Sequence, residues 1–192
     1  MKVNLYDFDK TIYQGDSSTD FFFFALMKYP RIVKRIPRII GSAILYKLGK
    51  KSKTEMKEVN FSFLQDIPNI NQFVLDFWAS HACYIKDFYL EKDHKQDIII
   101  SASPEFLLEP MTKDLKVMDL IGSKVDKKTG KFKGLNCHGE EKIKRLYKKH
   151  KAVTVIEAYS DSHSDDPMLK LAKKAYYVKG KKCIPLDFHK NM

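Results

Sequence analysis

Short runs of apolar, mostly β-branched residues constrain the fold of this chain most strongly. The clearest runs are DIIIS at 97–101 and AVTVIEAYSD at 152–161, and KVNLY at 2–6 is a shorter one. A continuous run, as opposed to an alternating one, is typical of a parallel strand that is buried on both faces. Helical patterns separate these runs, so the sequence predicts an α/β protein with a mostly parallel sheet.

Helical spacing with many aromatic residues fills the segment between the first two of these strands. Residues 17–91 therefore indicate an inserted helical module. A chain of 192 residues, 44% of them hydrophobic, can bury one sizeable core and still carry a small insertion. We predict a core domain of residues 1–16 and 92–192, and an inserted helical cap domain of residues 17–91.

Shorter patterns predict the remaining elements. In SPEFLLEPM we expect Ser103 to be the N-cap of a helix whose first residue is Pro104. The segment 123–134, SKVDKKTGKFKG, predicts a hairpin with Thr129 and Gly130 near its turn. An amphipathic helix and a closing strand pair are predicted for GEEKIKRLYKKH at 139–150 and AYYVKGKKCIPL at 175–186.

Polar side chains follow three of the predicted strands at the same end. They are Asp7, Asp9 and Thr11 after the first strand, Ser101 after the second, and Asp161 and Asp165 after the third, with Lys142 at the start of a helix between them. The carboxyl ends of parallel strands meet at one edge of a sheet, where α/β proteins bind their ligands. Each residue alone has an ordinary structural explanation, such as a turn or a helix cap. Together and in this order they favour a functional site.

The order of four motifs, DFDKT, IIISAS, GEEK and YSDSHSDDPML, resembles the haloacid dehalogenase superfamily of phosphatases over nearly the whole chain. It is most similar to the subgroup related to phosphoserine phosphatase. The resemblance implies a Rossmann-like core with a mostly parallel sheet and an α-helical cap of the C1 type, inserted between the first and second motifs. NCHGEEKIKRL and AYSDSHSDDPML also look like the short bacterial phosphatidylglycerophosphate phosphatases.

The resemblance implies a role for each acid. Asp7 matches the nucleophile that forms an aspartyl-phosphate, and Asp9 matches the general acid and base. A magnesium ion would be held by Asp7, the backbone carbonyl of Asp9, and Asp161. Asp165 would support either the water shell of this ion or the Lys142 ammonium group.

The other motif residues are expected to contact the substrate. Ser101, Ala102 and Lys142 would hold the phosphoryl oxygens. Thr11 is expected at the substrate site, where it stabilises the first loop. In the resembling phosphoserine phosphatases a Glu that meets the substrate amino group stands at the position of Asp16, so the shorter acid here weakens phosphoserine as the substrate.

Three positions depart from the motifs of this family. The first motif often has Gly where Lys10 stands, and the last motif often has Gly at the positions of Ser160 and Ser162. All ionisable positions that the chemistry needs are filled.

The net charge of +11 is concentrated in one segment. Nine Lys and Arg residues and no acid lie between positions 28 and 53. From 32 to 44, apolar and basic residues fall on separate arcs of a helix that Pro37 would kink or divide. This helix would either pack within the cap or lie on an anionic membrane surface, and no run of about 20 apolar residues is present to span a bilayer. The FFFF segment at 21–24 is predicted to belong to the core, with Phe22 and Phe23 as alternative pocket residues.

The compartment prediction follows from the cysteines and the N-terminus. The three Cys residues are odd in number and include no C-x-x-C pair, as expected for reduced thiols in a cytoplasm. The first residues lack the apolar region of a signal peptide. We predict a cytoplasmic protein, with peripheral contact at the inner face of the membrane if the basic helix binds lipid.

The sequence therefore predicts a Mg²⁺-dependent phosphomonoester hydrolase. The first candidate substrate is a lipid-linked phosphate such as phosphatidylglycerophosphate, and the alternative is phosphoserine or another small soluble monoester. A non-enzymatic membrane- or nucleic-acid-binding adaptor on the same fold is the remaining alternative. Nucleic acid is not favoured as a partner, because no helix-turn-helix, RNP-like or zinc motif is present.

Overall fold

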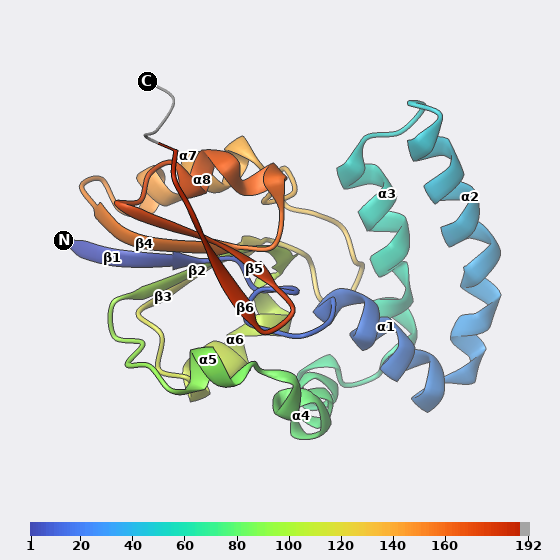
Figure 1. Cartoon of the computed structure of the whole chain (residues 1–192). Coiled ribbons are helices and arrows are strands. Elements are labelled where there is room, and N and C mark those ends of the chain that lie inside the picture. Colours follow the sequence, from blue (N-terminus) through green and yellow to red (C-terminus); the bar gives the residue numbers. More distant parts are fainter. Residues whose placement is uncertain (189–192) are drawn as a thin grey trace.

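A six-stranded sheet forms the centre of the computed structural model, which describes residues 1–188 (Figure 1). Its strand order is β3-β2-β1-β4-β5-β6. The first five strands are parallel, and β6 pairs with β5 in the antiparallel direction. The predicted α/β class is confirmed. The strands are β1 (Lys2–Tyr6), β2 (Asp97–Pro104), β3 (Asp119–Ser123), β4 (Thr154–Ser160), β5 (Lys174–Lys179) and β6 (Lys182–Leu186).

Helices cover both faces of the sheet. In chain order they are α1 (Ser17–Lys28), η1 (Pro30–Arg35), α2 (Ile36–Lys47), α3 (Lys53–Asn60), η2 (Phe61–Asp66), α4 (Ile70–His81), η3 (Ala82–Tyr84), α5 (Asp87–Leu90), α6 (Glu105–Asp114), α7 (Glu140–Lys149), η4 (His163–Asp165) and α8 (Asp166–Leu169). Helices α7 and α8 lie on one face, and α4, α5 and α6 on the other (Figure 1). Successive residues of β2 alternate between the two cores: Ile98 and Ile100 pack with Leu146 of α7, whereas Ile99 packs with Leu107 of α6.

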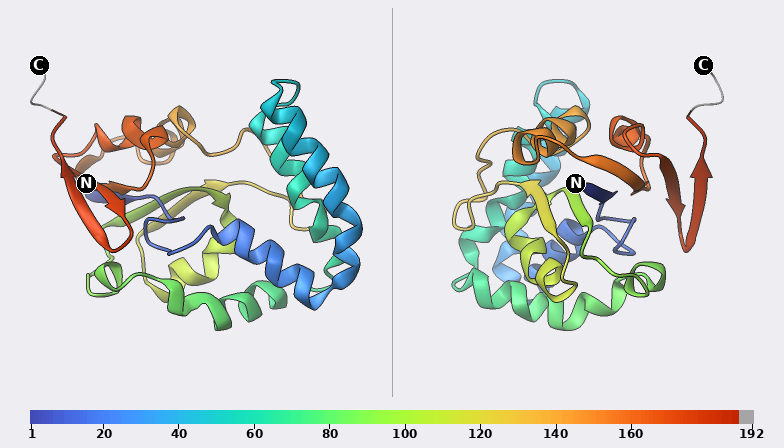
Figure 2. Two further views of the ribbon diagram at one scale, coloured as in Figure 1. Left: turned by 45° about the vertical axis from the view of Figure 1, so that its right-hand side comes forward. Right: turned by 90° about the vertical axis from the view of Figure 1, so that its left-hand side faces the viewer.

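The inserted segment is helical throughout and shares part of its core with the sheet. Phe21 of α1 and Phe77 and Trp78 of α4 belong to the same buried cluster as Tyr6 of β1. The Trp78 indole donates a hydrogen bond of 2.6 Å to the carbonyl of Leu107. Helices α2 and α3 instead form a pair beside the sheet (Figure 2). The division into a cap of residues 17–91 and a core stays a prediction, and residues 189–192 of that core lie outside the described part of the chain.

Pro37 divides the basic helix, as the sequence predicted. The chain forms the 3-10 helix η1 before it, and Pro37 lies in the first turn of α2. Two basic residues of this segment are used within the fold. Arg35 forms an ion pair with Asp66, and Arg31 donates a hydrogen bond of 2.9 Å to the Asp66 carbonyl.

One local prediction was wrong. Strand β2 continues to Pro104, so helix α6 begins at Glu105, and Ser103 does not cap it. Its hydroxyl instead donates to Asp9.

The hairpin predicted at 123–134 is present in a short form. Val125 and Phe132 form an antiparallel bridge, and on either side of it the Asp126 N–H donates to the Lys131 carbonyl and the Lys133 N–H donates to the Lys124 carbonyl. The turn lies at 127–129, next to Gly130.

Candidate active site

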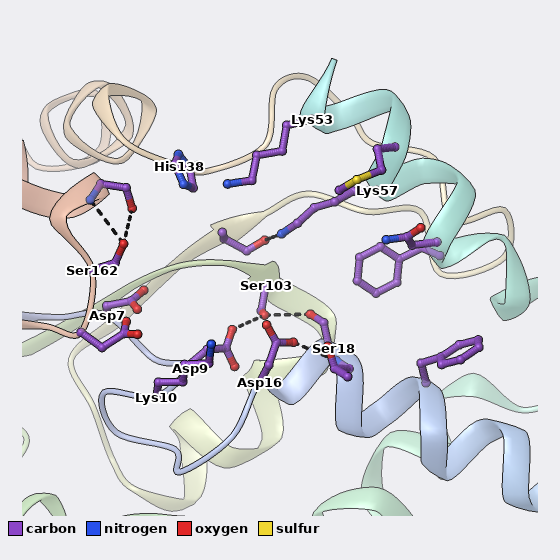
Figure 3. Close-up of a pocket in the computed structure, with 18 of the residues that line it drawn as sticks. Asp7, Asp9, Lys10, Asp16, Ser18, Lys53, Lys57, Ser103, His138 and Ser162 are labelled. Carbon is purple, nitrogen blue, oxygen red and sulfur yellow. Dashed lines mark hydrogen bonds between the residues drawn. The ribbon is translucent and has the colours of Figure 1, made fainter. Parts of the chain in front are cut away.

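A cavity of about 540 Å³ lies at the carboxyl ends of β1, β2 and β4 (Figure 3). Helices α1 and α3 form its other wall, which is partly apolar. This volume falls in the usual range of small-molecule sites. The ionisable lining residues are Asp7, Asp9, Lys10, Asp16, Lys53, Lys57, His138, Lys142, Asp161 and Asp165. The edge of the sheet therefore gathers the acids that the sequence placed there.

Lys142 joins two of these acids at the floor of the cavity. Its Nζ donates hydrogen bonds of 2.7 Å to Asp7 Oδ1 and 2.8 Å to Asp165 Oδ2. The same oxygen, Asp165 Oδ2, also accepts a hydrogen bond of 2.7 Å from the Ser160 hydroxyl. Of the two roles predicted for Asp165, the structure shows contact with the Lys142 ammonium. Ser160 thus replaces a family glycine with a side chain that orients Asp165.

Burial and charge act in opposite directions on this cluster. Burial raises the pKa of Asp7 to about 7, although the nearby Lys142 ammonium partly offsets the rise. Burial also acts to lower the pKa of Lys142, but the carboxylates of Asp7 and Asp165 more than offset it, so that the Lys142 pKa is raised. Lys142 is therefore a permanent positive charge beside Asp7.

Asp9 is held by hydrogen bonds at both carboxylate oxygens. The backbone N–H of Ser17 donates to Oδ1 at 2.7 Å, and the Ser103 hydroxyl donates to Oδ2 at 2.5 Å. Burial raises the pKa of Asp9, and the nearby charge of Asp16 raises it further. A carboxyl group in this environment retains its proton at a higher pH than an exposed aspartate.

The donor chemistry of this edge suits Mg²⁺. In residues 1–188, no three His, Cys, Asp or Glu side chains are arranged to hold a metal ion. The predicted set, however, contains only two carboxylates, Asp7 and Asp161, with the carbonyl of Asp9. Mg²⁺ is commonly held by one or two carboxylates and completes its octahedron with water. Both carboxylates line the cavity, and Oδ1 of Asp165 is buried without a hydrogen-bond partner among the described residues.

The structure separates the predicted substrate residues into two groups. Ala102, Lys142 and Asp16 line the cavity, and Asp16 also caps α1 by accepting a hydrogen bond from Thr19. Ser101 is buried and does not belong to the lining, although its hydroxyl accepts a hydrogen bond of 3.1 Å from the Ser103 N–H.

The structure does not place Thr11 at the cavity. Its side chain is fully buried, does not line the cavity, and has no hydrogen-bond partner among residues 1–188. This position is compatible with the predicted role of Thr11 in stabilising the first loop.

Lys10 stands where the family motif often has Gly, and its backbone conformation is one that favours glycine. Its φ is 59°, in the left-handed region that favours glycine, which often stands at this position in the resembling proteins. The buried Lys86 donates a hydrogen bond from its ammonium group to the Lys10 carbonyl. This hydrogen bond helps to hold Lys10 in the left-handed conformation, although Lys10 is not a glycine.

Several cavity residues were not predicted from the sequence. Lys53, Lys57 and His138 line the cavity, as does Ser103. Lys53 and Lys57 are four residues apart and therefore share a helix face, which was a usable signal. Phe22 and Phe23, which were the alternative pocket residues of the FFFF segment, both line the cavity, whereas Phe21 and Phe24 are buried.

Solved structures share this fold at low sequence identity. A protein of unknown function from Bordetella pertussis Tohama I has a TM-score of 0.75 at 17% identity, with 92% of this chain and 89% of that chain covered. A phosphoserine phosphohydrolase-like protein from Francisella tularensis subsp. tularensis SCHU S4 has a TM-score of 0.59 at 17% identity, with coverages of 92% and 87%. A phosphoserine phosphatase, solved as a phospho-aspartyl intermediate analogue, has a TM-score of 0.59 at 16% identity, with coverages of 92% and 85%.

No curated protein sequence matches this chain significantly. Residues 5–170, in contrast, match the family described as haloacid dehalogenase-like hydrolase. The match runs from the first to the last of the four motifs, and it confirms both the family resemblance and the expectation of a hydrolase. The chain belongs to the haloacid dehalogenase-like hydrolase family.

Proposed function

We propose that this protein is a Mg²⁺-dependent phosphomonoester hydrolase that acts through an aspartyl-phosphate on Asp7. The observation that carries the proposal is the buried contact of Lys142 with Asp7 and Asp165, beside Asp9 at the cavity floor. This group supplies a nucleophile, a fixed positive charge and a proton carrier within one site. The phosphoserine phosphatases among the structural neighbours have the same fold and support this reaction class.

Asp7 is positioned for nucleophilic attack. Lys142 binds Oδ1, and none of the described residues donates a hydrogen bond to Oδ2. In the proposed reaction Oδ2 forms a bond to phosphorus, and the bond from phosphorus to the ester oxygen breaks. The Lys142 ammonium also stabilises negative charge on the transferring phosphoryl group.

Asp9 moves the proton in both steps. Its raised pKa favours the protonated form that donates to the departing ester oxygen. The resulting carboxylate then takes a proton from water, whose oxygen attacks phosphorus and releases phosphate and Asp7. Ser103 and Ser17 keep the carboxyl group oriented through both transfers.

Mg²⁺ would be held by Asp7, Asp161 and the Asp9 carbonyl. When bound, the ion would neutralise charge between the carboxylates and the phosphoryl oxygens. Asp165 would act beyond these ligands, through Lys142.

A lipid-linked phosphomonoester is the first candidate substrate, and a small soluble monoester such as phosphoserine is the second. An exposed apolar surface supports the first. Ile40 and Ile44 of α2 and Leu48 at its C-cap are 55%, 53% and 63% exposed. The exposed Lys34 and Arg38 lie in the same segment. Apolar residues flanked by basic ones suit the surface of an anionic bilayer. None of the helices in residues 1–188 is long and apolar enough to cross a membrane.

Hydrolysis of an aryl phosphate tests the proposed reaction. We expect Mg²⁺-dependent turnover that chelation removes and that Asp7→Asn abolishes. Asp93→Asn is a matched control, because Asp93 is exposed and lies outside the cavity. Turnover in Asp7→Asn close to that of the wild type would contradict the assignment, and so would full activity without a divalent cation. No turnover by the wild type would favour the adaptor alternative.

Sedimentation with vesicles tests the lipid contact. The wild type should bind phosphatidylglycerol vesicles more strongly than phosphatidylcholine vesicles, and salt should weaken the binding. Replacing Ile40, Ile44 and Leu48 with Ser should remove it, whereas Leu75→Ser, at an exposed position on α4, should not. If the wild type and both variants bind the vesicles equally, or if none of them binds, the soluble monoester becomes the better candidate substrate.

A further inference from the structure

One face of α3 carries positive charge into the cavity. Lys53, Met56, Lys57 and Asn60 all line it, at the spacing of one helix face. Figure 3 shows Lys53 and Lys57 extending from α3 across the cavity, Lys53 toward His138. The Lys57 ammonium donates a hydrogen bond of 3.0 Å to the carbonyl of Ala102, which lies within the second motif. A basic surface therefore faces the place where the leaving group of a bound phosphomonoester would lie.

These two lysines have no carboxylate partner. Within residues 1–188, neither Lys53 nor Lys57 forms an ion pair. The acids of α3 are used elsewhere: Glu55 accepts hydrogen bonds from Ser52, and Glu58 accepts one from the Phe132 N–H. Burial lowers the pKa of Lys53 and of Lys57, and the carboxylates across the cavity, Asp165 for Lys53 and mainly Asp9 and Asp16 for Lys57, offset only part of this shift. A ligand anion would relieve this cost.

His138 and Asn60 extend the polar surface on either side. His138 lines the cavity near Lys53 (Figure 3), and burial together with the Lys53 charge lowers its pKa. Asn60 Oδ1 is buried with no hydrogen-bond partner among the described residues, so it can accept a bond from a ligand hydroxyl. The lining also includes the apolar side chains of Phe22, Phe23 and Met56. The cavity therefore combines polar and apolar surface.

We propose that Lys53 and Lys57 form a subsite for a second anionic group, carried by the leaving group of the phosphomonoester substrate. This inference rests on the proposed phosphatase function and narrows its substrate class. The second anion is either a phosphodiester or a carboxylate, because both present oxygens to an ammonium group. A lysine binds such a group as a point charge with up to three donors, and Lys57 uses one of these on Ala102.

Three small soluble substrates test the subsite without a lipid tail. Glycerol 3-phosphate carries no second anion, 3-phosphoglycerate carries a carboxylate, and glycerophosphoglycerol phosphate carries a phosphodiester. We expect the wild type to prefer one of the last two over glycerol 3-phosphate by about tenfold or more in kcat/KM, as for a hydrogen bond to a charged group. The preferred compound identifies the anion.

Substitutions on α3 locate this preference. Lys53→Met and Lys57→Met should each reduce the preference ratio by about tenfold, and Lys57→Arg should restore part of it. Lys50→Met is the matched control, because Lys50 is exposed just before α3 and does not line the cavity. If the variants lower kcat/KM equally for all three substrates, the lysines contact the transferring phosphoryl group and the subsite is refuted. A wild-type ratio near one also refutes it.

An aryl phosphate separates this failure from failure of the proposed function. It has no second anion, so its Mg²⁺-dependent hydrolysis reports on the reaction centre alone. If the aryl phosphate is hydrolysed but kcat/KM for the substrates with a second anion is about the same as for glycerol 3-phosphate, only the subsite is contradicted. No hydrolysis of any of the four compounds contradicts the phosphatase function and, with it, the inference that depends on it.

Discussion

Replacing Lys142 with Met should strongly destabilise the protein as well as remove its activity. The Lys142 side chain is 2% exposed, and its Nζ lies 2.7 Å and 2.8 Å from carboxylates that are themselves largely buried. Met keeps most of the volume but leaves Asp7 and Asp165 without their common cation. Breaking a buried ion pair from one side costs about 3–5 kcal/mol.

We therefore expect the free energy of unfolding at pH 7 to fall by about 3–5 kcal/mol. Protonation of Asp7 adds little to this difference, because the pKa of Asp7 is already about 7 in the wild type, which bears most of the same cost at pH 7.

The loss should depend on pH in a defined direction. In the folded wild type the pKa of Asp7 is raised to about 7, above its unfolded value. Stability from its protonated form is therefore complete below about pH 4 and is lost as the pH rises through about 7. The charge of Lys142 lowers the pKa of Asp7, so removing Lys142 should let folded Asp7 keep its proton to a higher pH. The variant should thus lose stability more steeply than the wild type between about pH 6 and pH 8, where folded wild type releases the Asp7 proton and the variant keeps it.

Urea unfolding in the presence of a chelator measures these values. The chain has one Trp, Trp78, which is buried at 4% exposure and reports on the shared core. Lys144→Met is the control, because Lys144 is exposed on the same helix and should change stability by less than about 0.5 kcal/mol. A loss for Lys142→Met below about 1 kcal/mol at pH 7, or one that does not change with pH, would show that Lys142 does not compensate the buried carboxylates.

Two further substitutions test other parts of the account. The hydrogen bond from Ser103 to Asp9 Oδ2 lowers the pKa of Asp9, so Ser103→Ala should raise this pKa. We expect kcat to fall and the alkaline limb of the kcat/KM profile to move to higher pH. An unchanged profile would contradict the role of Ser103 in positioning Asp9. Gly130→Ala should reduce the free energy of unfolding by about 1–3 kcal/mol, because its φ is 75° and a Cβ would lie 2.3 Å from the Phe61 carbonyl oxygen. Gly134→Ala has φ 97° with no atom near its Cβ, so urea unfolding should show a smaller loss, and equal losses would contradict the contact.

The strands and the acids could be predicted because they depend on local pattern. The run at 97–101 could only be buried on both faces, and the alternation of Ile98, Ile99 and Ile100 between two cores bears this out. Once the strands are parallel, their carboxyl ends share one edge, so Asp7 and Asp161 must lie near each other. No knowledge of the helices was needed for this step.

The cap side of the site could not be predicted in the same way. The spacing of Lys53 and Lys57 shows that they share a face of α3, but which way this face points depends on how α3 docks against the core. Bonds such as that from the Phe132 N–H to Glu58 determine this docking, and they join residues far apart in the sequence. The burial of Thr11 was not predicted for a related reason: the direction of a side chain that follows a strand depends on the conformation of the turn.

Asp7 is the proposed acceptor of the phosphoryl group. The direct test is to mix the wild type with substrate and Mg²⁺, quench in acid within one turnover, and locate the added phosphoryl group by peptide mass spectrometry. We expect a phosphoryl group on the peptide that contains Asp7, absent from Asp7→Asn and lost on further incubation before the quench. A phosphoryl group on another residue, or turnover with no phosphorylated protein at any time, would contradict it.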